Sequence, residues 1–327
     1  MEILKSVFLF AIGLVLLIKG GDWFVDGAVG IAKRFRLPDI VVGATVVSIG
    51  TTLPEVMVST TGALAGSGAM AYGNAIGSII CNTALIAAIS ITCNPGPVNV
   101  KSMKTPVLFF FMSAALYCLA AYGLGTFPRW MGFVMLAIFV VYMILTVRNG
   151  MKNPDQVAGE EEEEGGKEKK LWQELLLLVV GAAVIAVGAD LLVEHGQVIA
   201  LALGVPETVV ALLFVALGTS LPELVTTITS LKKGRASLGV GNVIGANIFN
   251  LVLVSGVAVS LAPFDVPAEN TLLDTGLNLS LVFDIPVMLG VMVLMTIPAL
   301  LSKKLGRWQG IALLSIYAAF CVCQFVL

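Results

Sequence analysis

Long apolar runs follow one another along almost the whole chain, and each is long enough to form a membrane-spanning helix. A helix needs about 20 apolar residues to cross a bilayer. The first and sixth runs exceed that length, so we expect them to be tilted. The pattern predicts an all-α polytopic membrane protein with ten transmembrane helices, near 3–32, 38–64, 70–93, 105–122, 128–148, 171–203, 206–231, 236–261, 279–301 and 307–326.

Charged residues are rare, at 12% of 327 residues, and gather between the predicted spans. Lys and Arg follow the odd-numbered spans, and the other connections are nearly free of them apart from Arg129. Because basic loops stay in the cytoplasm, we expect a multi-pass protein of the cell membrane with both termini outside. The basic residues concerned are Lys33, Arg34, Arg36, Lys101, Lys104, Arg148, Lys152, Lys167, Lys169, Lys170, Lys232, Lys233, Arg235, Lys303, Lys304 and Arg307.

One long polar stretch, 149–170, divides the chain into two five-span halves, 1–148 and 171–327. It contains the acidic run 160–164, which is either a cation sensor or part of a solvated cytoplasmic linker. We favour the linker, because a block of like charges repels itself and stays unfolded.

The two halves are related in sequence by a constant offset of 168, as in 223 − 55 for Glu223 and Glu55. Residues 22–82 align with 190–250 without a gap and share 21 identities in 61 positions. An offset that contains five spans inserts the second copy upside down. Inverted repeats with a binding site near the midplane are typical of secondary transporters, although a structural protein can also arise by duplication.

The repeat carries SIGTTLPE at 48–55 and ALGTSLPE at 216–223. A carboxylate within the membrane is costly and points to function. Pro54 lacks an amide hydrogen and clashes with the carbonyl of Gly50, so we expect a kink near 48–50 that frees carbonyl oxygens. Such oxygens are tolerated only where protein or an ion satisfies them. The second copy repeats this arrangement with Gly218, Thr219, Pro222 and Glu223.

The expected ligands are all oxygen atoms: two carboxylates, hydroxyls such as that of Thr51, and carbonyls. Such a set suits Ca²⁺ or Na⁺ and not zinc or copper. The charge of −2 on Glu55 and Glu223 is neutralised by one Ca²⁺, two Na⁺ or two protons. Ions that compete for the same charge exclude one another, which is the basis of antiport.

A second motif follows each first one, GNAIGSIICN at 73–82 and GNVIGANIFN at 241–250. Its glycines permit close helix approach. Its amides, Asn74, Asn82, Asn242, Asn250 and the unmatched Asn247, either bind ions or hydrogen bond between helices.

Together these motifs resemble the paired alpha-repeats of the cation/calcium exchanger superfamily, most closely its bacterial and archaeal sodium/calcium antiporter branch. The resemblance implies that Glu55 and Glu223 are the central Ca²⁺ ligands and also bind Na⁺. It implies that Thr51 and Thr219 give oxygens to Ca²⁺ and that Asn82 and Asn250 line the middle of the site. Flanking Na⁺ sites would use the carbonyls of Ser48 and Ala216, with Thr52, Ser220 and Ser78 nearby.

Two positions depart from the pattern of that family. Some members carry Asp where this chain has Asn82 or Asn250, so no third carboxylate is available here. Ala246 replaces the serine usual in the second repeat, which removes one hydroxyl and leaves the sodium stoichiometry open.

Other intramembrane polar residues offer either a cation-attracting vestibule or structural pairing. They are Lys19, the symmetry mates Asp22 and Asp190, the mates Asp26 and Glu194, and the single histidine, His195.

We therefore expect a Ca²⁺/Na⁺ antiporter that works by alternating access, with spans one and six moving across a core of spans two, three, seven and eight. The alternatives are a Ca²⁺/H⁺ or K⁺-dependent antiporter of the same fold, or a passive cation channel. The sequence shows no nucleophile–base pair and no metal-binding histidine cluster, so we expect no enzyme. We also expect no cofactor and no nucleic-acid partner; the partners are Ca²⁺, Na⁺ and the lipid bilayer.

Overall fold

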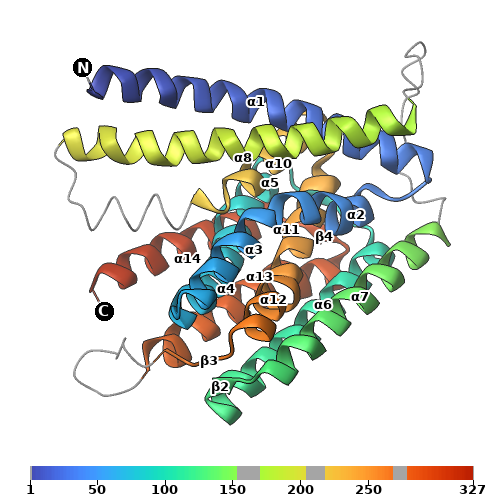
Figure 1. Ribbon diagram of the computed structural model, residues 1–327. Coiled ribbons are helices and arrows are strands. Elements are labelled where there is room, and N and C mark those ends of the chain that lie inside the picture. The colour runs from blue at the N-terminus through green and yellow to red at the C-terminus, as the bar shows by residue number, and fades with distance from the viewer. Residues whose placement is uncertain (1, 153–169, 204–217, 268–277, 327) are drawn as a thin grey trace.

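The computed structural model of the chain describes residues 2–152, 170–203, 218–267 and 278–326, and these are almost entirely helical (Figure 1). Eight of the described helical segments are long and apolar enough to cross a membrane. With two shorter helices they form ten groups in chain order, as the hydrophobic pattern predicts. Residues 206–217 of the predicted seventh span lie outside the described part of the chain.

The first half contains five helical groups, several of which include a π-helical turn, labelled η. The helix α7 continues three residues into the predicted linker, which begins at 149. The elements are α1 (Glu2–Arg34), α2 (Asp39–Val42), η1 (Gly43–Val47), α3 (Ser48–Leu64), α4 (Gly68–Cys81), η2 (Asn82–Ala87), α5 (Ala88–Cys93), α6 (Val100–Cys118), η3 (Leu119–Leu124) and α7 (Arg129–Met151).

The second half follows the same plan in its described residues. Its long first helix begins at residue 171, where the second half was predicted to start. The elements are α8 (Leu171–Ala202), α10 (Leu221–Lys232), α11 (Ala236–Phe249), η5 (Asn250–Val254), α12 (Ser255–Leu261), η7 (Ser280–Asp284), α13 (Ile285–Ser302) and α14 (Arg307–Val326).

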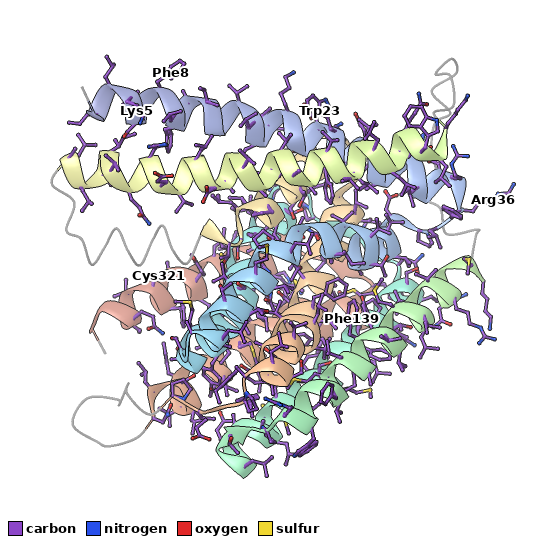
Figure 2. The ribbon with its side chains drawn as sticks, viewed as in Figure 1. Lys5, Phe8, Trp23, Arg36, Phe139 and Cys321 are labelled. Atoms are coloured by element: carbon purple, nitrogen blue, oxygen red, sulfur yellow. The ribbon has the colours of Figure 1, made fainter. Side chains whose placement is uncertain are left out.

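Helices α1 and α8 lie side by side along one face of the molecule, above the other helices in Figure 1. Glycines let their backbones touch, since a Cβ atom on Gly13 would lie 2.9 Å from the carbonyl oxygen of Gly188. Small residues at such interfaces favour van der Waals packing in lipid. An ion pair between Arg34 and Glu174, 2.8 Å long, also joins the two helices. On the opposite side of α1, Phe8 and Trp23 project away from the bundle (Figure 2).

Two short antiparallel strand pairs, which the all-α pattern does not predict, join the halves at their connections. Strand β1 (Gly96–Pro97) pairs with β4 (Lys304–Leu305), and β2 (Thr126–Phe127) pairs with β3 (Phe264–Asp265). β1 and β3 are repeat mates, since 264 − 96 = 168, yet each pairs with a different connection of the opposite half. β1 and β4 both lie in connections that run from an odd-numbered to an even-numbered helical group. β2 and β3 both lie in connections that run from an even-numbered to an odd-numbered group. This arrangement confirms two inverted five-helix repeats.

Both halves fold as one core rather than as separate domains. One continuous apolar cluster includes residues from every described helical group except α10, among them Phe24, Phe110, Tyr142 and Phe249. α11 lies at its centre and contacts helices of both halves. Each half therefore supplies part of the packing around the motifs of the other.

In the first copy, an irregular turn lies just before the stretch near 48–50 where a kink is expected. α3 is helical from Ser48 onward with Pro54 inside it, and the irregular turn is η1, just before Ser48. In the second copy, Thr219 and Ser220 form a turn and α10 begins at Leu221. Pro222 is then in the first helical turn, where its missing amide costs no hydrogen bond.

Candidate cation site between the two halves

The two glutamates of the repeated motifs are buried in the centre of the molecule. Glu55 lies on α3 and Glu223 in the first turn of α10, and both side chains are 0% exposed. The two carboxyl groups are close enough to interact electrostatically. The structure therefore brings together the two residues on which the predicted site depends.

Neither carboxylate has a partner among the described residues. All four oxygen atoms are buried without a hydrogen bond, and neither glutamate belongs to any of the described ion pairs. Burial of an unpaired charge costs several kcal/mol or more. A site of this kind requires either a bound cation or protons.

Two further pairs of unpartnered polar side chains are related by the repeat. The hydroxyls of Thr52 and Ser220 and the amides of Asn82 and Asn250 are buried and make no hydrogen bond with described residues. Each pair is separated by the repeat offset, as in 250 − 82 = 168. With the two glutamates, three repeat-related pairs of side chains therefore lack hydrogen bonds. Most buried polar atoms in proteins are hydrogen bonded, so these pairs point to a bound ligand that supplies the missing interactions.

Thr51 and Thr52 connect the halves at the site. Both lie next to the carboxylate of Glu223, which comes from the other half. Thr51 donates its hydroxyl hydrogen to Oδ1 of Asn242 at 3.1 Å, which leaves its oxygen lone pairs directed elsewhere. Thr219 makes the equivalent bond to Oδ1 of Asn74 at 3.3 Å.

Asn74 and Asn242 brace the two halves against each other. Each accepts a threonine hydrogen from the opposite half and donates its amide hydrogens to its own half. Asn242 donates to Thr226 at 3.0 Å, and Asn74 donates to Ser59 at 2.8 Å. Of the two roles left open for the asparagines, these two make interhelical hydrogen bonds, whereas Asn82 and Asn250 do not.

Asn82 and Asn250 each begin a π-helical turn, η2 and η5. Single π-turns within α-helices are frequent at functional sites, because they shift the backbone register and aim side chains inward. The sequence marks these positions only through their asparagines, and the π-turns themselves were not predicted.

The remaining predicted site residues differ in their burial and hydrogen bonding, and one of them is not described. The Ser48 hydroxyl donates to the carbonyls of Gly43 and Asn242 at 2.8 and 3.0 Å, so this side chain stabilises η1. Ser78 is buried, and its mate Ala246 presents only a methyl group at 0% exposure. Ala216 lies outside the described residues.

The site is closed toward the α1–α8 pair. A cavity of about 10 Å³ lies between Phe24, Gly50, Thr51, Pro54 and Pro222, which has room for about one water at most. The Phe24 ring packs against Gly50, where an added Cβ would lie 2.8 Å from the ring. Phe24 thus blocks the way between the site and α1.

Two further polar groups lie in the core: Asn247, which makes interhelical hydrogen bonds as one of its two predicted roles, and Asp284, which sequence reasoning missed. Asn247 donates to Thr83 at 2.7 Å, beside Asn82, and to the Met292 sulfur at 3.2 Å. Asp284 on η7 accepts a hydrogen bond of 2.7 Å from Gln324. A carboxylate inside a predicted span is a signal that would have found Asp284.

Among the weaker candidates, the acidic residues of α1 form ion pairs. Lys233, which follows α10, lies 2.6 Å from Asp26 and 3.7 Å from Asp22. His195 is buried, with Nδ1 unpartnered among described residues. Within the described part, no group of three or more His, Cys, Asp and Glu side chains is arranged to hold a metal.

Comparisons with known proteins place the whole chain beside one group of transporters. The profile of the family described as sodium/calcium exchanger protein matches residues 5–148 and 174–326. The sodium/calcium exchanger MaX1 of Methanosarcina acetivorans is 30% identical over 348 residues, covering 96% of this chain and 97% of its own. The putative antiporter CaxA of Alkalimonas amylolytica is 34% identical over 77% of this chain and 79% of its own.

A solved structure matches over nearly the same extent. The sodium-calcium exchanger NCX_Mj, soaked with 10 mM Na⁺ and zero Ca²⁺, superposes with a TM-score of 0.77 at 32% identity, covering 97% of this chain and 98% of that one. The same exchanger soaked with 2.5 mM Na⁺ and 0.1 mM Sr²⁺ gives a TM-score of 0.78 at 33% identity.

Proposed function

This chain belongs to the sodium/calcium exchanger protein family, and we propose that it exchanges Ca²⁺ for Na⁺ by alternating access at a site shared by Glu55 and Glu223. The resemblance expected from the paired motifs is confirmed. So is the multi-pass membrane fold on which the antiport prediction depends.

One observation supports this site above others: two fully buried carboxylates, one from each inverted half, with no hydrogen bond and no cationic side chain among the described residues. A single Ca²⁺ between them neutralises the charge of −2 and replaces the missing hydrogen bonds. Because Na⁺ neutralises the same carboxylates, Ca²⁺ must leave before Na⁺ enters, and this exclusion couples the two fluxes.

The surrounding oxygens would complete the coordination. In this proposal Glu55 and Glu223 bind Ca²⁺ directly, Thr51 and Thr219 add oxygens, and Asn82 and Asn250 line the middle. Na⁺ sites beside them would use the carbonyls of Ser48 and Ala216 with Thr52, Ser220 and Ser78. Oxygen ligands of this kind, six to eight for Ca²⁺, fit a hard cation.

Alternating access would come from α1 and α8 moving together across the rest of the molecule. Their close packing and the Arg34–Glu174 ion pair support movement as one body. Phe24 on α1 packs against Gly50 near the site, so a shift of α1 along its axis would open or close the path to the ions.

The proposed orientation keeps both termini outside and the linker 149–170 in the cytoplasm of a cell-membrane protein. Lys303 and Lys304 lie in the connection of β4, and Lys101 and Lys104 lie in the first turns of α6, just after β1. Near β2 and β3 the charged residues are Arg129, the first residue of α7, and Asp265. This asymmetry follows the positive-inside rule.

Flux into proteoliposomes tests the proposal. Wild-type protein should take up radiolabelled Ca²⁺ only when Na⁺ inside can exchange for it. Glu55→Gln and Glu223→Gln should each abolish uptake, since each removes a charge the cation needs. Asp265→Asn, the same chemical change at an exposed position on β3, should have no effect. Exchange at the wild-type rate in both glutamine variants would refute the site.

Proton coupling is the second candidate, and Ala246 is the observation that favours it. A methyl group in place of a hydroxyl removes one oxygen from the Na⁺ positions, whereas two protons need no coordination shell. Uptake driven by a pH gradient without Na⁺ would establish this alternative, K⁺ dependence would indicate a K⁺-coupled antiporter, and uptake without any counter-ion would indicate a channel.

A further inference from the structure

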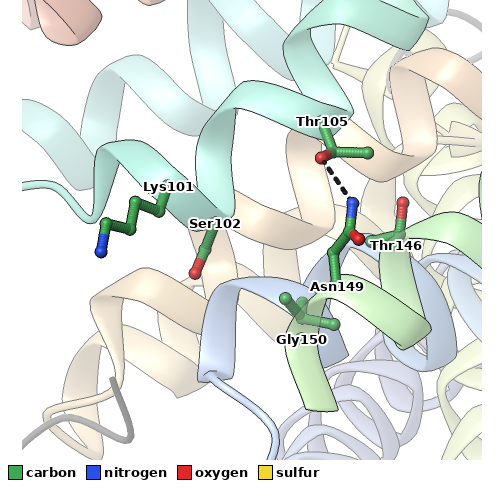
Figure 3. A pocket seen from close by; sticks show the side chains of 7 residues that line it. Lys101, Ser102, Thr105, Thr146, Asn149 and Gly150 are labelled. Atoms are coloured by element: carbon green, nitrogen blue, oxygen red, sulfur yellow. Dashed lines mark hydrogen bonds between the residues drawn. The ribbon is translucent and has the colours of Figure 1, made fainter. Parts of the chain in front are cut away.

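A second polar cavity lies away from the ion site, between α2, α6 and α7. Its volume is about 200 Å³. It opens where α2 and α6 begin and α7 ends, next to basic connections of the chain. Its lining consists of Val41, Lys101, Ser102, Thr105, Thr146, Asn149 and Gly150 (Figure 3).

Hydrogen-bonding groups dominate the walls of this cavity. Asn149 donates to the Thr105 hydroxyl at 3.3 Å across it. Thr146 is 2% exposed, and its hydroxyl makes no hydrogen bond with the described residues. A buried hydroxyl without a partner costs about 1–3 kcal/mol, so Thr146 indicates that something polar occupies the space.

The charge of the cavity favours an anion. Lys101 lines it, and no acidic side chain of the described residues does. The cavity adjoins both the beginning of α6 at Val100 and the end of α7 at Met151. The dipoles of these two helix ends have opposite signs, so the positive charge comes from Lys101. Its volume of about 200 Å³ is enough for a tetrahedral phosphate group with some hydration.

We propose that this cavity binds a phosphate group, carried by an anionic lipid headgroup or as a free ion. Basic pockets between membrane helices at the cytoplasmic interface suit lipid phosphates, and the three helix ends place this cavity at such an interface. Lys101 supplies the charge, and Thr146 and Asn149 supply hydrogen bonds. This inference does not depend on which ions the exchanger couples.

A phosphate bound in this cavity would affect η1, the segment that leads into the ion site. Tyr142, one turn before Thr146 and beside it, donates to the carbonyl of Ala44 in η1 at 2.7 Å. Val41, on the cavity wall, accepts from Thr45 through its carbonyl at 2.7 Å. A bound phosphate would therefore hold α2 and η1 against α7.

Native mass spectrometry of the full chain in detergent tests the proposal. The protein is titrated separately with phosphatidylglycerol, with zwitterionic phosphatidylcholine and with inorganic phosphate. We expect phosphatidylglycerol to bind at least tenfold more tightly than phosphatidylcholine. Lys101→Met should weaken this binding about tenfold, the usual effect of losing one charged hydrogen bond, and Thr146→Val should weaken it several-fold.

Lys104→Met is the matched control, because Lys104 is an exposed lysine on the same helix that does not line the cavity. Competition by inorganic phosphate would identify the free ion as a ligand, and its failure would leave the lipid headgroup as the source. Equal losses in Lys101→Met and Lys104→Met, or no preference of the wild type for either phosphate probe over phosphatidylcholine, would overturn the proposal.

Discussion

The two halves present the same buried, unpartnered polar groups at the candidate site but support them differently. Glu55 and Glu223, Thr52 and Ser220, and Asn82 and Asn250 are matched in position and equally buried. Their supports are not matched: Pro54 lies within α3, whereas Pro222 lies in the first turn of α10. The groups proposed to contact the cation are therefore the symmetric part, and the packing behind them is where the halves have diverged.

The largest test of that comparison concerns the two unpartnered asparagines. Asn82→Ala and Asn250→Ala should each weaken Ca²⁺-dependent exchange by about 10- to 100-fold, as expected for one lost polar ligand worth roughly 1.5–3 kcal/mol. The measurement is the Ca²⁺ concentration that gives half-maximal flux. Similar losses in both variants would support a symmetric site, whereas a loss confined to one half would break the comparison.

The bracing asparagines should affect folding more than ion binding. Asn242→Ala should lower the free energy of unfolding by about 2–3 kcal/mol, because it removes the acceptor of the buried Thr51 hydroxyl and the amide that donates to Thr226. Thr226 keeps its own bond to the Pro222 carbonyl. Asn74→Ala should cost less, about 1–2 kcal/mol, since Asn74 is only partly buried. Denaturant unfolding in detergent measures both. A larger loss for Asn74→Ala would show that the braces do not differ as described.

A smaller effect is expected where one half has a hydroxyl and the other does not. Ala246→Ser should lower the Na⁺ concentration for half-maximal exchange about two- to fivefold, because it restores an oxygen worth roughly 0.5–1 kcal/mol. Ser78→Ala should raise that concentration. If Na⁺ dependence is unchanged in both variants, these positions do not contact Na⁺, and proton coupling gains support.

The smallest effect concerns an ion pair that one repeat contains and the other lacks. Lys233 pairs with Asp26 on α1, whereas its repeat mate, 233 − 168 = 65, is Ala65. Lys233→Met should change the rate of exchange less than fivefold, since an exposed pair contributes about 0.2–1 kcal/mol, and the difference should shrink in high salt. A salt-independent change would mean that Lys233 acts otherwise than through this pair.

Much of this arrangement could be predicted from the sequence, because the signals are strong in lipid. The lengths of the apolar runs match the thickness of a bilayer, and they predicted the spans. The constant offset of 168 between the two copies predicted the inverted halves. Glu55 and Glu223 stood out because a membrane-buried carboxylate is costly. These inferences depend on local composition and spacing, which a single sequence contains.

The rest depended on contacts between distant residues. Nothing near Asn74 or Asn242 shows that they brace the halves while Asn82 and Asn250 are left unpartnered, because the partners come from the opposite repeat. The π-turns at Asn82 and Asn250 and the strand pairs β1–β4 and β2–β3 also arise from tertiary packing. The π-helical turn η1, which ends at Val47 just before the stretch near 48–50 where a kink is predicted, was not predicted as such.

The most direct test is the Ca²⁺ binding stoichiometry of the purified protein in Na⁺-free solution, measured by equilibrium dialysis with radiolabelled Ca²⁺. One Ca²⁺ per chain is expected, displaced by Na⁺ and lost in Glu55→Gln and in Glu223→Gln alike. If one of these variants still bound Ca²⁺ with wild-type affinity, a single cation could not be shared between the two carboxylates.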